Sequence, residues 1–342
     1  MKSPSLIDIS VLMLFHARTD SFAQVWAEVK KARPARLFLY QDGPRPDHDD
    51  MPGIMACREM VSDDNIDWQC EVHRNYQEKN RGCDPSGYLS QQWAFSLTDK
   101  CIVLEDDVVP SQSFFPFCKE MLDRYENDER ITMVAGFNTD EQTQLPCGDS
   151  YFFTRTFNIW GWASWARVVN NWDGEYGFVN DPEQFKLLCD KVRQYRQHSV
   201  LPNAYRQHAS SGKQYFESIF GAYMLMHDGL AIMPRVNMIN NVGLNSGAHY
   251  SAALELMPRR LRRIFTMGRH DLTFPLTHPQ EVREYAEYQK RMFLLYAWDH
   301  PWRKVQYSLE ELWLNLRHGN ISNITHAIAN RIGIMLHGTR HV

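Results

Sequence analysis

Three consecutive carboxylates, Glu105, Asp106 and Asp107, follow an apolar run at residues 101–104. Such a run is typical of a buried parallel strand, and in open α/β sheets ligands bind at the carboxyl ends of these strands. Adjacent acids repel one another unless a cation or hydrogen-bond donors offset their charge. Mg2+ and Mn2+ take oxygen ligands and share them with substrate phosphates. The segment therefore predicts a metal site that faces a nucleotide diphosphate, although a solvated turn or a helix start would also suit three acids.

The elements around this triplet indicate how it is positioned. In the first 140 residues we predict strands at residues 7–15, 35–40, 68–72, 101–104 and 131–136, and helices at about 20–33, 49–62, 84–97 and 113–126. Asp84 as N-cap and Pro85 at the first position mark the start of the third helix. This alternation predicts an α/β fold with a mostly parallel sheet and right-handed crossovers.

The pattern loosens after residue 138. We expect helices at about 181–198 and 213–228, a strand at 231–236 and amphipathic helices from residue 258 onward. The chain is thus divided into one domain over residues 1–254, with halves at 1–140 and 141–254, and a helical C-terminal extension over residues 255–342.

Composition restricts the class of protein. The 342 residues carry a formal net charge of −4, which gives no reason to expect nucleic-acid binding. The seven cysteines are scattered without a Cys-x-x-Cys pair, which argues against a zinc site or a disulfide framework and for a reducing compartment. The apolar run at residues 9–15 is short and follows Asp8, so it predicts a strand and not a signal peptide or membrane span.

We therefore expect a cytoplasmic protein. Residues 255–342 carry more Lys and Arg than Asp and Glu, so peripheral contact with the inner face of a membrane through these basic helices is a further expectation. The chain has neither Gly-x-Gly-x-x-Gly after the first strand nor Gly-x-x-x-x-Gly-Lys-Ser/Thr, which argues against a Rossmann dehydrogenase and a P-loop enzyme.

An ordered set of short motifs resembles the GT-A glycosyltransferases, including N-acetylglucosaminyltransferase I and the bacterial sugar transferases of capsule and lipopolysaccharide assembly. The set comprises Gln41-Asp42, Ser86-Gly87-Tyr88, Leu104-Glu105-Asp106-Asp107 and Gly161-Trp162. The resemblance covers about residues 7–250. It implies a GT-A fold with nucleotide-binding and acceptor-binding halves, a UDP-sugar donor, Mn2+ or Mg2+, and a glycan or lipid-linked glycan acceptor in cell-surface polysaccharide synthesis.

The resemblance also implies roles at matching positions. Asp107 would bind the metal that bridges the diphosphate, while Glu105 and Asp106 would contact the ribose and donor sugar or hold the metal's waters. Asp42 would accept a hydrogen bond from the uracil N–H, and Arg18 would contact the diphosphate. By spacing alone, Asp42 is equally suited to a turn in Asp-Gly-Pro.

Two further groups are candidates for the donor site. Lys79 and Arg81 lie in a Gly-containing loop ahead of a helix, where free N–H groups and the helix dipole favour an anion such as the diphosphate. Two solvated loop cations would suit the same sequence. His249 is a candidate metal or diphosphate ligand, as in some GT-A enzymes, although a lone histidine is more often structural.

Glu217 is the candidate catalytic base. Inverting transfer to a hydroxyl needs one base to take the acceptor proton. Bacterial relatives place an aromatic-Asp pair ahead of a helix shortly before a Gly-Leu strand entry, and here that place holds Phe216-Glu217, with Glu in place of Asp. The alternative is a surface glutamate in the first turn of a helix.

Aromatic residues supply the candidate substrate-binding groups. Trp160 and Trp162 would stack on sugar faces, and Gly161 would allow close backbone approach to a ligand. Core packing is the alternative, and it is favoured for Trp165. Near the C-terminus, an Arg cluster with Leu261, Ile264 and Phe265 would suit a membrane interface. The helices with Trp298, Trp302 and Trp313 could equally pack on the catalytic domain or on a second subunit, and such packing is favoured over membrane contact.

The sequence leaves three hypotheses about function. The leading one is a metal-dependent inverting glycosyltransferase. The second is a metal-dependent phosphoesterase or nucleotidyltransferase that uses the same acids, and the third is a non-catalytic glycan-binding protein on a GT-A scaffold. The third would keep the aromatic residues without needing Asp107 or Glu217.

Overall fold

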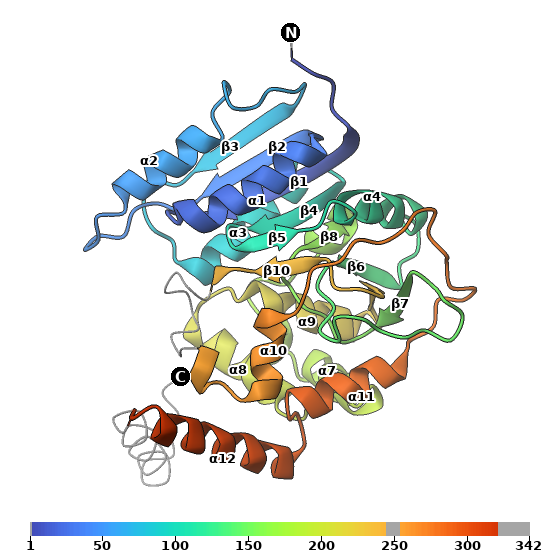
Figure 1. Ribbon diagram of the computed structural model, residues 1–342. Helices are drawn as coiled ribbons and strands as arrows, with labels where there is room; N and C mark the ends of the chain where they lie inside the picture. Colours follow the sequence, from blue (N-terminus) through green and yellow to red (C-terminus); the bar gives the residue numbers. More distant parts are fainter. Residues whose placement is uncertain (1, 244–253, 321–342) are drawn as a thin grey trace.

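A mixed eight-stranded sheet forms the centre of the molecule (Figure 1). The computed structural model describes residues 2–243 and 254–320. The ten strands it contains there are β1 (Ile7–Phe15), β2 (Pro34–Gln41), β3 (Glu71–Tyr76), β4 (Lys100–Glu105), β5 (Val108–Pro110), β6 (Ile131–Ala135), β7 (Tyr151–Thr154), β8 (Trp162–Trp165), β9 (Leu230–Pro234) and β10 (Ile239–Asn241).

The strand order in the large sheet is β3-β2-β1-β4-β8-β6-β9-β7, and β5 pairs with β10 in a separate two-stranded sheet. β1 pairs in parallel with both β2 and β4, whereas β8 and β7 run antiparallel to their neighbours. The expected α/β class with a mostly parallel sheet is therefore confirmed. Strands from residues 1–140 and from residues 141–254 share this one sheet.

Helices cover the sheet and extend below its second half (Figure 1). They are α1 (Thr19–Ala32), α2 (Met51–Met60), α3 (Cys83–Phe95), α4 (Phe114–Arg124), α5 (Ala166–Val169), α6 (Gly177–Asn180), α7 (Pro182–Gln194), α8 (Leu201–Ser211), α9 (Phe216–Met226), α10 (Arg259–Thr266), α11 (Ala286–Leu295) and α12 (Pro301–Arg317). α10, α11 and α12 form the expected helical C-terminal region.

Local sequence explains why these segments pack as they do. β1 and β4 are nearly continuous apolar runs because both faces of the central sheet are covered. α4 buries one stripe with helical spacing, which is the pattern of an amphipathic helix packed on a core. Its buried side chains are Phe114, Phe115, Phe117, Cys118, Met121 and Leu122.

Several boundaries differ from the sequence-based expectation. β3 begins at Glu71, three residues later than expected. Trp68 lies outside the strand and is fully buried, with its ring against that of Trp26. α3 begins at Cys83 with Gly82 as its N-cap, so Asp84 is not the cap. Gly82 has a φ of 89°, a conformation that glycine adopts without strain.

Two apolar residues of α10 that were expected to suit a membrane interface pack against the protein instead. Ile264 is buried, and Phe265 lies with its ring centroid 5.3 Å from that of Trp160. Trp298 packs on His198 with centroids 5.5 Å apart, whereas Trp302 and Trp313 are 81% and 54% exposed. Trp298 therefore packs within the chain, and α12 packs through the buried Tyr307 and Leu314. Packing of Trp302 and Trp313 on a second subunit stays a prediction. In the described part of the chain, no helix is long and apolar enough to cross a membrane.

Candidate active site

The candidate site lies where β2, β1 and β4 end. These strands are adjacent and parallel, so their carboxyl ends meet at one edge of the sheet. Asp42 follows β2, Arg18 follows β1 and immediately precedes α1, and the acidic triplet begins at the last residue of β4. Candidate residues separated by up to 89 positions are thereby brought together, which is how open α/β sheets form ligand sites.

Arg18 lies directly on the acidic triplet. Its Nη1 donates to Asp107 Oδ2 at 2.9 Å and its Nη2 donates to Asp106 Oδ1. The two carboxylates are almost completely buried, and Arg18 is about three-quarters buried. Burial opposes the charge on Arg18, but the two aspartates outweigh it and raise the pKa of the guanidinium. Arg18 is therefore a counter-charge for these two acids.

The triplet is nevertheless rich in unfavourable negative charge. Burial, followed by the charges of Asp107, Glu217 and Asp106, raises the pKa of Glu105 well above its usual value, and Arg18 offsets only part of this. Burial also raises the pKa of Asp106 against the opposing effect of Arg18. A site of this kind gains stability from an added cation.

We expect Glu105→Gln to stabilise the protein at neutral pH. A carboxyl group with a raised pKa in the folded state costs stability once the pH exceeds its unfolded pKa of about 4.3. The parent should therefore lose stability as the pH rises from that value, and Glu105→Gln should lack this loss. Urea denaturation across the pH range should show a higher free energy of unfolding for the variant at pH 7 and convergence near pH 4. Glu129→Gln, at an exposed site, is the control, and equal pH profiles for parent and Glu105→Gln would contradict the assignment.

Glu217 reaches the same edge of the sheet from the other half of the chain. It is the second residue of α9, and its charge contributes to the raised pKa of Glu105. Close packing of α9 on α3 sets this position: a Cβ added at Gly87 would lie only 2.7 Å from Phe216 Cδ1. Gly87 thus allows the helix that carries Glu217 to approach the helix beside the triplet.

The residues present fit a divalent cation. The triplet offers buried carboxylate oxygens with one arginine as their counter-charge. Within residues 2–243 and 254–320, no group of three or more His, Cys, Asp and Glu side chains is arranged to hold a metal ion by itself. This donor set suits Mg2+ or Mn2+ held by one or two carboxylates together with substrate phosphates.

The chain passes close to Asp107 again after β10. Val242 N–H donates to the Asp107 carbonyl at 2.8 Å, and a Cβ added at Gly243 would lie 2.1 Å from Asp107 Oδ2. A side chain at position 243 would therefore collide with the carboxylate. His249, the candidate metal or diphosphate ligand, lies six positions further on and outside the described residues, so its role stays a prediction.

Asp42 binds the loop that carries Lys79 and Arg81. Its carboxylate accepts hydrogen bonds from Gly43 N–H (2.8 Å), Arg81 N–H (2.8 Å), Gly82 N–H (3.0 Å) and Asn80 Nδ2 (2.9 Å). The side chains of Lys79 and Arg81 are exposed. These bonds fasten the loop to the end of β2. The contact of Asp42 with a base, and of Lys79 and Arg81 with a diphosphate, stay predictions.

Asp42→Ala should destabilise the protein by roughly 2–4 kcal/mol, because it leaves several backbone N–H groups without their acceptor. The freed loop should also be cut faster by trypsin at Lys79 or Arg81. Urea denaturation and mass spectrometry of the tryptic fragments measure the two effects. Asp47→Ala, at an exposed position, is the control. Unchanged stability and cleavage rate would contradict the loop-fastening role.

The two tryptophans of the Trp160-Gly161-Trp162 segment have different environments: Trp160 lines a cavity, and Trp162 lies in the core. Trp160 is partly exposed and packs edge-on against Phe137, with centroids 4.7 Å apart. Trp162 is fully buried in β8 and stacks on Trp172 and Phe220, so its ring has no face open to a sugar. Gly161 has a φ of 63°, and a Cβ there would lie 2.5 Å from Ile239 Cδ1. The glycine thus permits close packing of β10 on β8.

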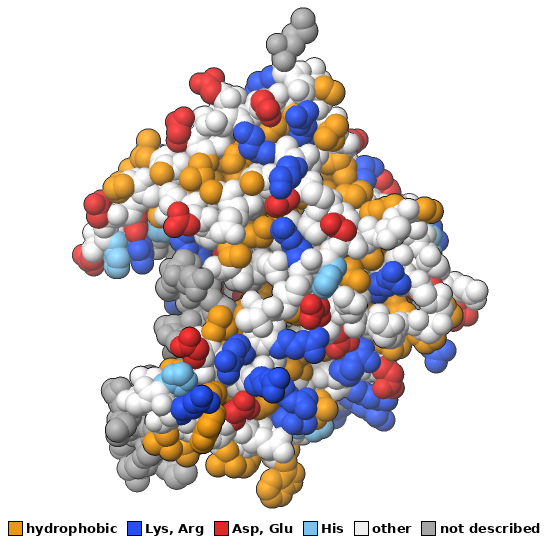
Figure 2. Space-filling model, viewed as in Figure 1, with side chains coloured by type: hydrophobic (Ala, Val, Ile, Leu, Met, Phe, Trp, Pro, Cys, Tyr) orange, Lys and Arg blue, Asp and Glu red, His pale blue; other side chains and the backbone are white. Residues whose placement is uncertain are grey.

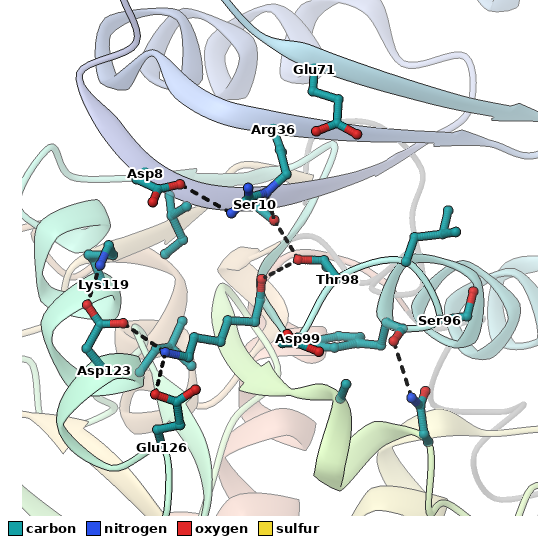
Figure 3. A pocket seen from close by; sticks show the side chains of 17 residues that line it. Asp8, Ser10, Arg36, Glu71, Ser96, Thr98, Asp99, Lys119, Asp123 and Glu126 are labelled. Atoms are coloured by element: carbon teal, nitrogen blue, oxygen red, sulfur yellow. Dashed lines mark hydrogen bonds and ion pairs between the residues drawn. The ribbon is translucent and has the colours of Figure 1, made fainter.

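A polar cavity of about 650 Å³ lies at the opposite, amino edge of the sheet (Figure 3). Its charged side chains are engaged with one another: Arg36 pairs with Asp8 at 3.2 Å, and Lys100 pairs with both Asp123 and Glu126 at 3.0 Å. Figure 3 draws these pairs among the side chains that line the cavity. The internal pairing explains the polarity of this cavity without a ligand, and none of the candidate site residues lines it.

Apolar cavities instead border Glu217. One of about 720 Å³ and one of about 280 Å³ both include Glu217, Phe157 and Trp298 in their walls. Trp160 lines the larger cavity together with residues of the C-terminal extension. The sequence did not predict that Phe157, Tyr296 and Trp298 line these cavities. The aromatic enrichment around residues 151–175 was the signal for Phe157, whereas the other two follow only from the packing of the extension.

Comparison with known proteins gives distant structural similarities. No family model and no curated protein matches the sequence. Mouse xyloside xylosyltransferase 1 in its apo form is 11% identical, with 64% of this chain and 81% of that chain covered and a TM-score of 0.30. A putative glucose-1-phosphate thymidylyltransferase from Bacillus anthracis in complex with sucrose is 8% identical, with 51% and 75% covered and a TM-score of 0.28.

The inositol-1-phosphate CTP transferase from T. maritima is 10% identical, with 50% of this chain and 74% of that chain covered and a TM-score of 0.29. All three structures are therefore those of glycosyl- or nucleotidyltransferases. At these TM-scores the functional assignment rests on the geometry of the site.

Proposed function

We propose that this chain is a metal-dependent, inverting glycosyltransferase that moves a sugar from a UDP-sugar to a hydroxyl group of a glycan or lipid-linked glycan in cell-surface polysaccharide synthesis. One observation carries the proposal: Arg18 lies against the buried acids at the end of β4, and the packing of α9 on α3 brings Glu217 close enough for its charge to influence Glu105. This arrangement would suit a donor diphosphate and an acceptor hydroxyl that bind together.

Each residue has a part in the transfer. Arg18, which pairs with Asp106 and Asp107, would contact the donor diphosphate, and Asp107 would hold the cation. When bound, Mn2+ or Mg2+ would neutralise charge that develops on the leaving diphosphate. Glu217 takes the proton of the acceptor hydroxyl, whose oxygen attacks the anomeric carbon from the side opposite the nucleotide. Glu105 and Asp106 contact the donor sugar and ribose.

Calorimetry with UDP, GDP and CDP, each with and without Mn2+, tests the proposal. We expect UDP to bind in the presence of Mn2+, the other two nucleotides to bind more weakly, and all binding to decrease sharply when the metal is removed. Screening of UDP-sugars for hydrolysis and transfer then follows. Absence of nucleotide binding in either condition would refute the transferase proposal and favour a glycan-binding protein.

A further inference from the structure

The position of the two apolar cavities points to the kind of acceptor. Both border Glu217, the proposed base, and they share Phe157 and Trp298. The larger cavity lies between the 157–160 segment and the C-terminal extension, so residues from two parts of the chain form its walls. A volume of about 720 Å³ is within the usual range for ligand sites. A ligand in this cavity would therefore lie next to Glu217, the proposed base for the acceptor hydroxyl.

The walls of the larger cavity match an apolar ligand. Among its described lining residues are two acids, Glu217 and Glu311, and no lysine or arginine. A diphosphate favours cationic partners, which these described lining residues do not supply, so the nucleotide of the donor fits this cavity poorly. The apolar walls consist of Phe157, Ile159, Trp160, Leu256, Met257, Leu261, Ile264, Phe265, Tyr296 and Trp298.

The outer face of α12 carries a second apolar surface, which we call the α12 stripe. It consists of Trp302, Val305, Leu309, Leu312, Trp313 and Leu316, which are 42–81% exposed. At 3.6 residues per turn these side chains share an arc of about 100°, on the side opposite the buried Tyr307 and Leu314. One side of α12 thus packs on the protein, while the other presents apolar groups to the surroundings. A contiguous patch of this kind marks an interaction surface.

Basic residues accompany the α12 stripe. Arg303, Lys304 and Arg317 lie on the same helix, and Arg259 and Arg260 of α10 are exposed. Arg259 N–H donates to Glu310 of α12 at 2.9 Å, which joins the two helices. Figure 2 shows Lys and Arg side chains gathered above the apolar lower edge formed by α12. An apolar helix face with neighbouring cations fits an anionic bilayer surface.

We propose that the acceptor is an amphipathic membrane lipid whose apolar part occupies the cavity beside Glu217, while the α12 stripe rests on the membrane that supplies it. This proposal depends on the proposed transferase function and specifies its acceptor. The acceptor hydroxyl loses its proton to Glu217 as its oxygen bonds to the anomeric carbon. The bond from that carbon to the diphosphate breaks, and the nucleotide diphosphate leaves with the electron pair.

A chain-length series tests the cavity. Binding of n-alkyl β-glucosides, kept below their micelle concentrations, is measured by calorimetry. Affinity should rise by up to about fourfold per methylene until the cavity is filled. Leu261→Gln, which places an amide in the cavity wall, should remove most of this dependence. Leu187→Gln on α7, an exposed leucine outside the walls, should preserve it. Affinity that does not change with chain length, or an unchanged dependence in Leu261→Gln, would overturn the cavity assignment.

Vesicles test the α12 stripe. The full chain should sediment with phosphatidylcholine vesicles that contain phosphatidylglycerol, and added salt should weaken this binding. Leu309→Gln should reduce it by about tenfold, because a large apolar side chain no longer enters the bilayer. Leu97→Gln, at an exposed leucine of the opposite sheet edge, should bind as the parent does. Equal vesicle binding by parent and Leu309→Gln, or conversion by Leu309→Gln of a dimer to a monomer in light scattering, would overturn the membrane assignment.

These results remain separable from the transferase proposal, because nucleotide binding is measured independently. UDP binding with no chain-length dependence would overturn only the lipid acceptor. Chain-length dependence without nucleotide binding would establish an apolar site and refute its link to glycosyl transfer.

Discussion

Glu217→Gln is expected to lower the transfer rate by about 10²–10⁴-fold while donor and acceptor binding change little. The amide has nearly the same shape as the carboxylate but cannot accept the acceptor proton, and general base catalysis contributes an effect of this size. Loss of an interaction needed only in the transition state lowers kcat and kcat/KM together. Steady-state kinetics with both substrates, paired with calorimetry of UDP binding, separates the two effects.

Glu183→Gln is the matched control for this variant. Glu183 is exposed and lies in the first turn of α7, as Glu217 lies in the first turn of α9, so both substitutions remove a charge at a helix start. We expect Glu183→Gln to retain the parent rate. A Glu217→Gln variant with near-parental kcat would show that another group takes the proton.

Asp107→Asn is expected to weaken UDP binding in the presence of Mn2+ by about a hundredfold, which corresponds to about 2.8 kcal/mol. An amide oxygen is a poorer ligand for a divalent cation than a carboxylate, and the substitution also removes a partner of Arg18. The dependence of UDP affinity on Mn2+ should largely disappear with it. Calorimetry with and without the metal gives both values.

Asp123→Asn serves as its control, since this carboxylate of α4 pairs with Lys100 of β4 and with Lys119, and lies at the other edge of the sheet. Its UDP affinity should equal that of the parent. If Asp107→Asn keeps metal-dependent binding, the cation is held elsewhere, and the role assigned to Asp107 is wrong.

Much of the candidate site could be predicted from the sequence because it lies at strand ends. Apolar runs at residues 7–15, 35–40 and 101–104 predict parallel strands, and the carboxyl ends of such strands share one edge of a sheet. The polar residues that follow these runs must therefore lie close together, whatever the remainder of the chain does. The α/β class and the proximity of Asp42, Arg18 and the acidic triplet follow from this reasoning.

Interactions between distant segments could not be predicted in this way. Trp162 and its neighbours form β8, which lies between β4 and β6. Antiparallel pairing with these two remote strands buries Trp162, so its ring is not at the surface. Asp42 is a candidate base contact by position, yet its carboxylate accepts hydrogen bonds from a loop 38–40 residues later in the chain.

The sequence by itself determined which chemistry is available: carboxylates after a buried strand, a glutamate at a helix start and a cationic end to the chain. Periodicity and composition are local properties, and they are sufficient for this. Only the tertiary structure decided that Arg18 pairs with both Asp106 and Asp107, that Glu217 lies close enough for its charge to influence Glu105, and that the C-terminal helices wall an apolar cavity beside the proposed base. These arrangements depend on side-chain packing between segments far apart in sequence, which no local pattern encodes.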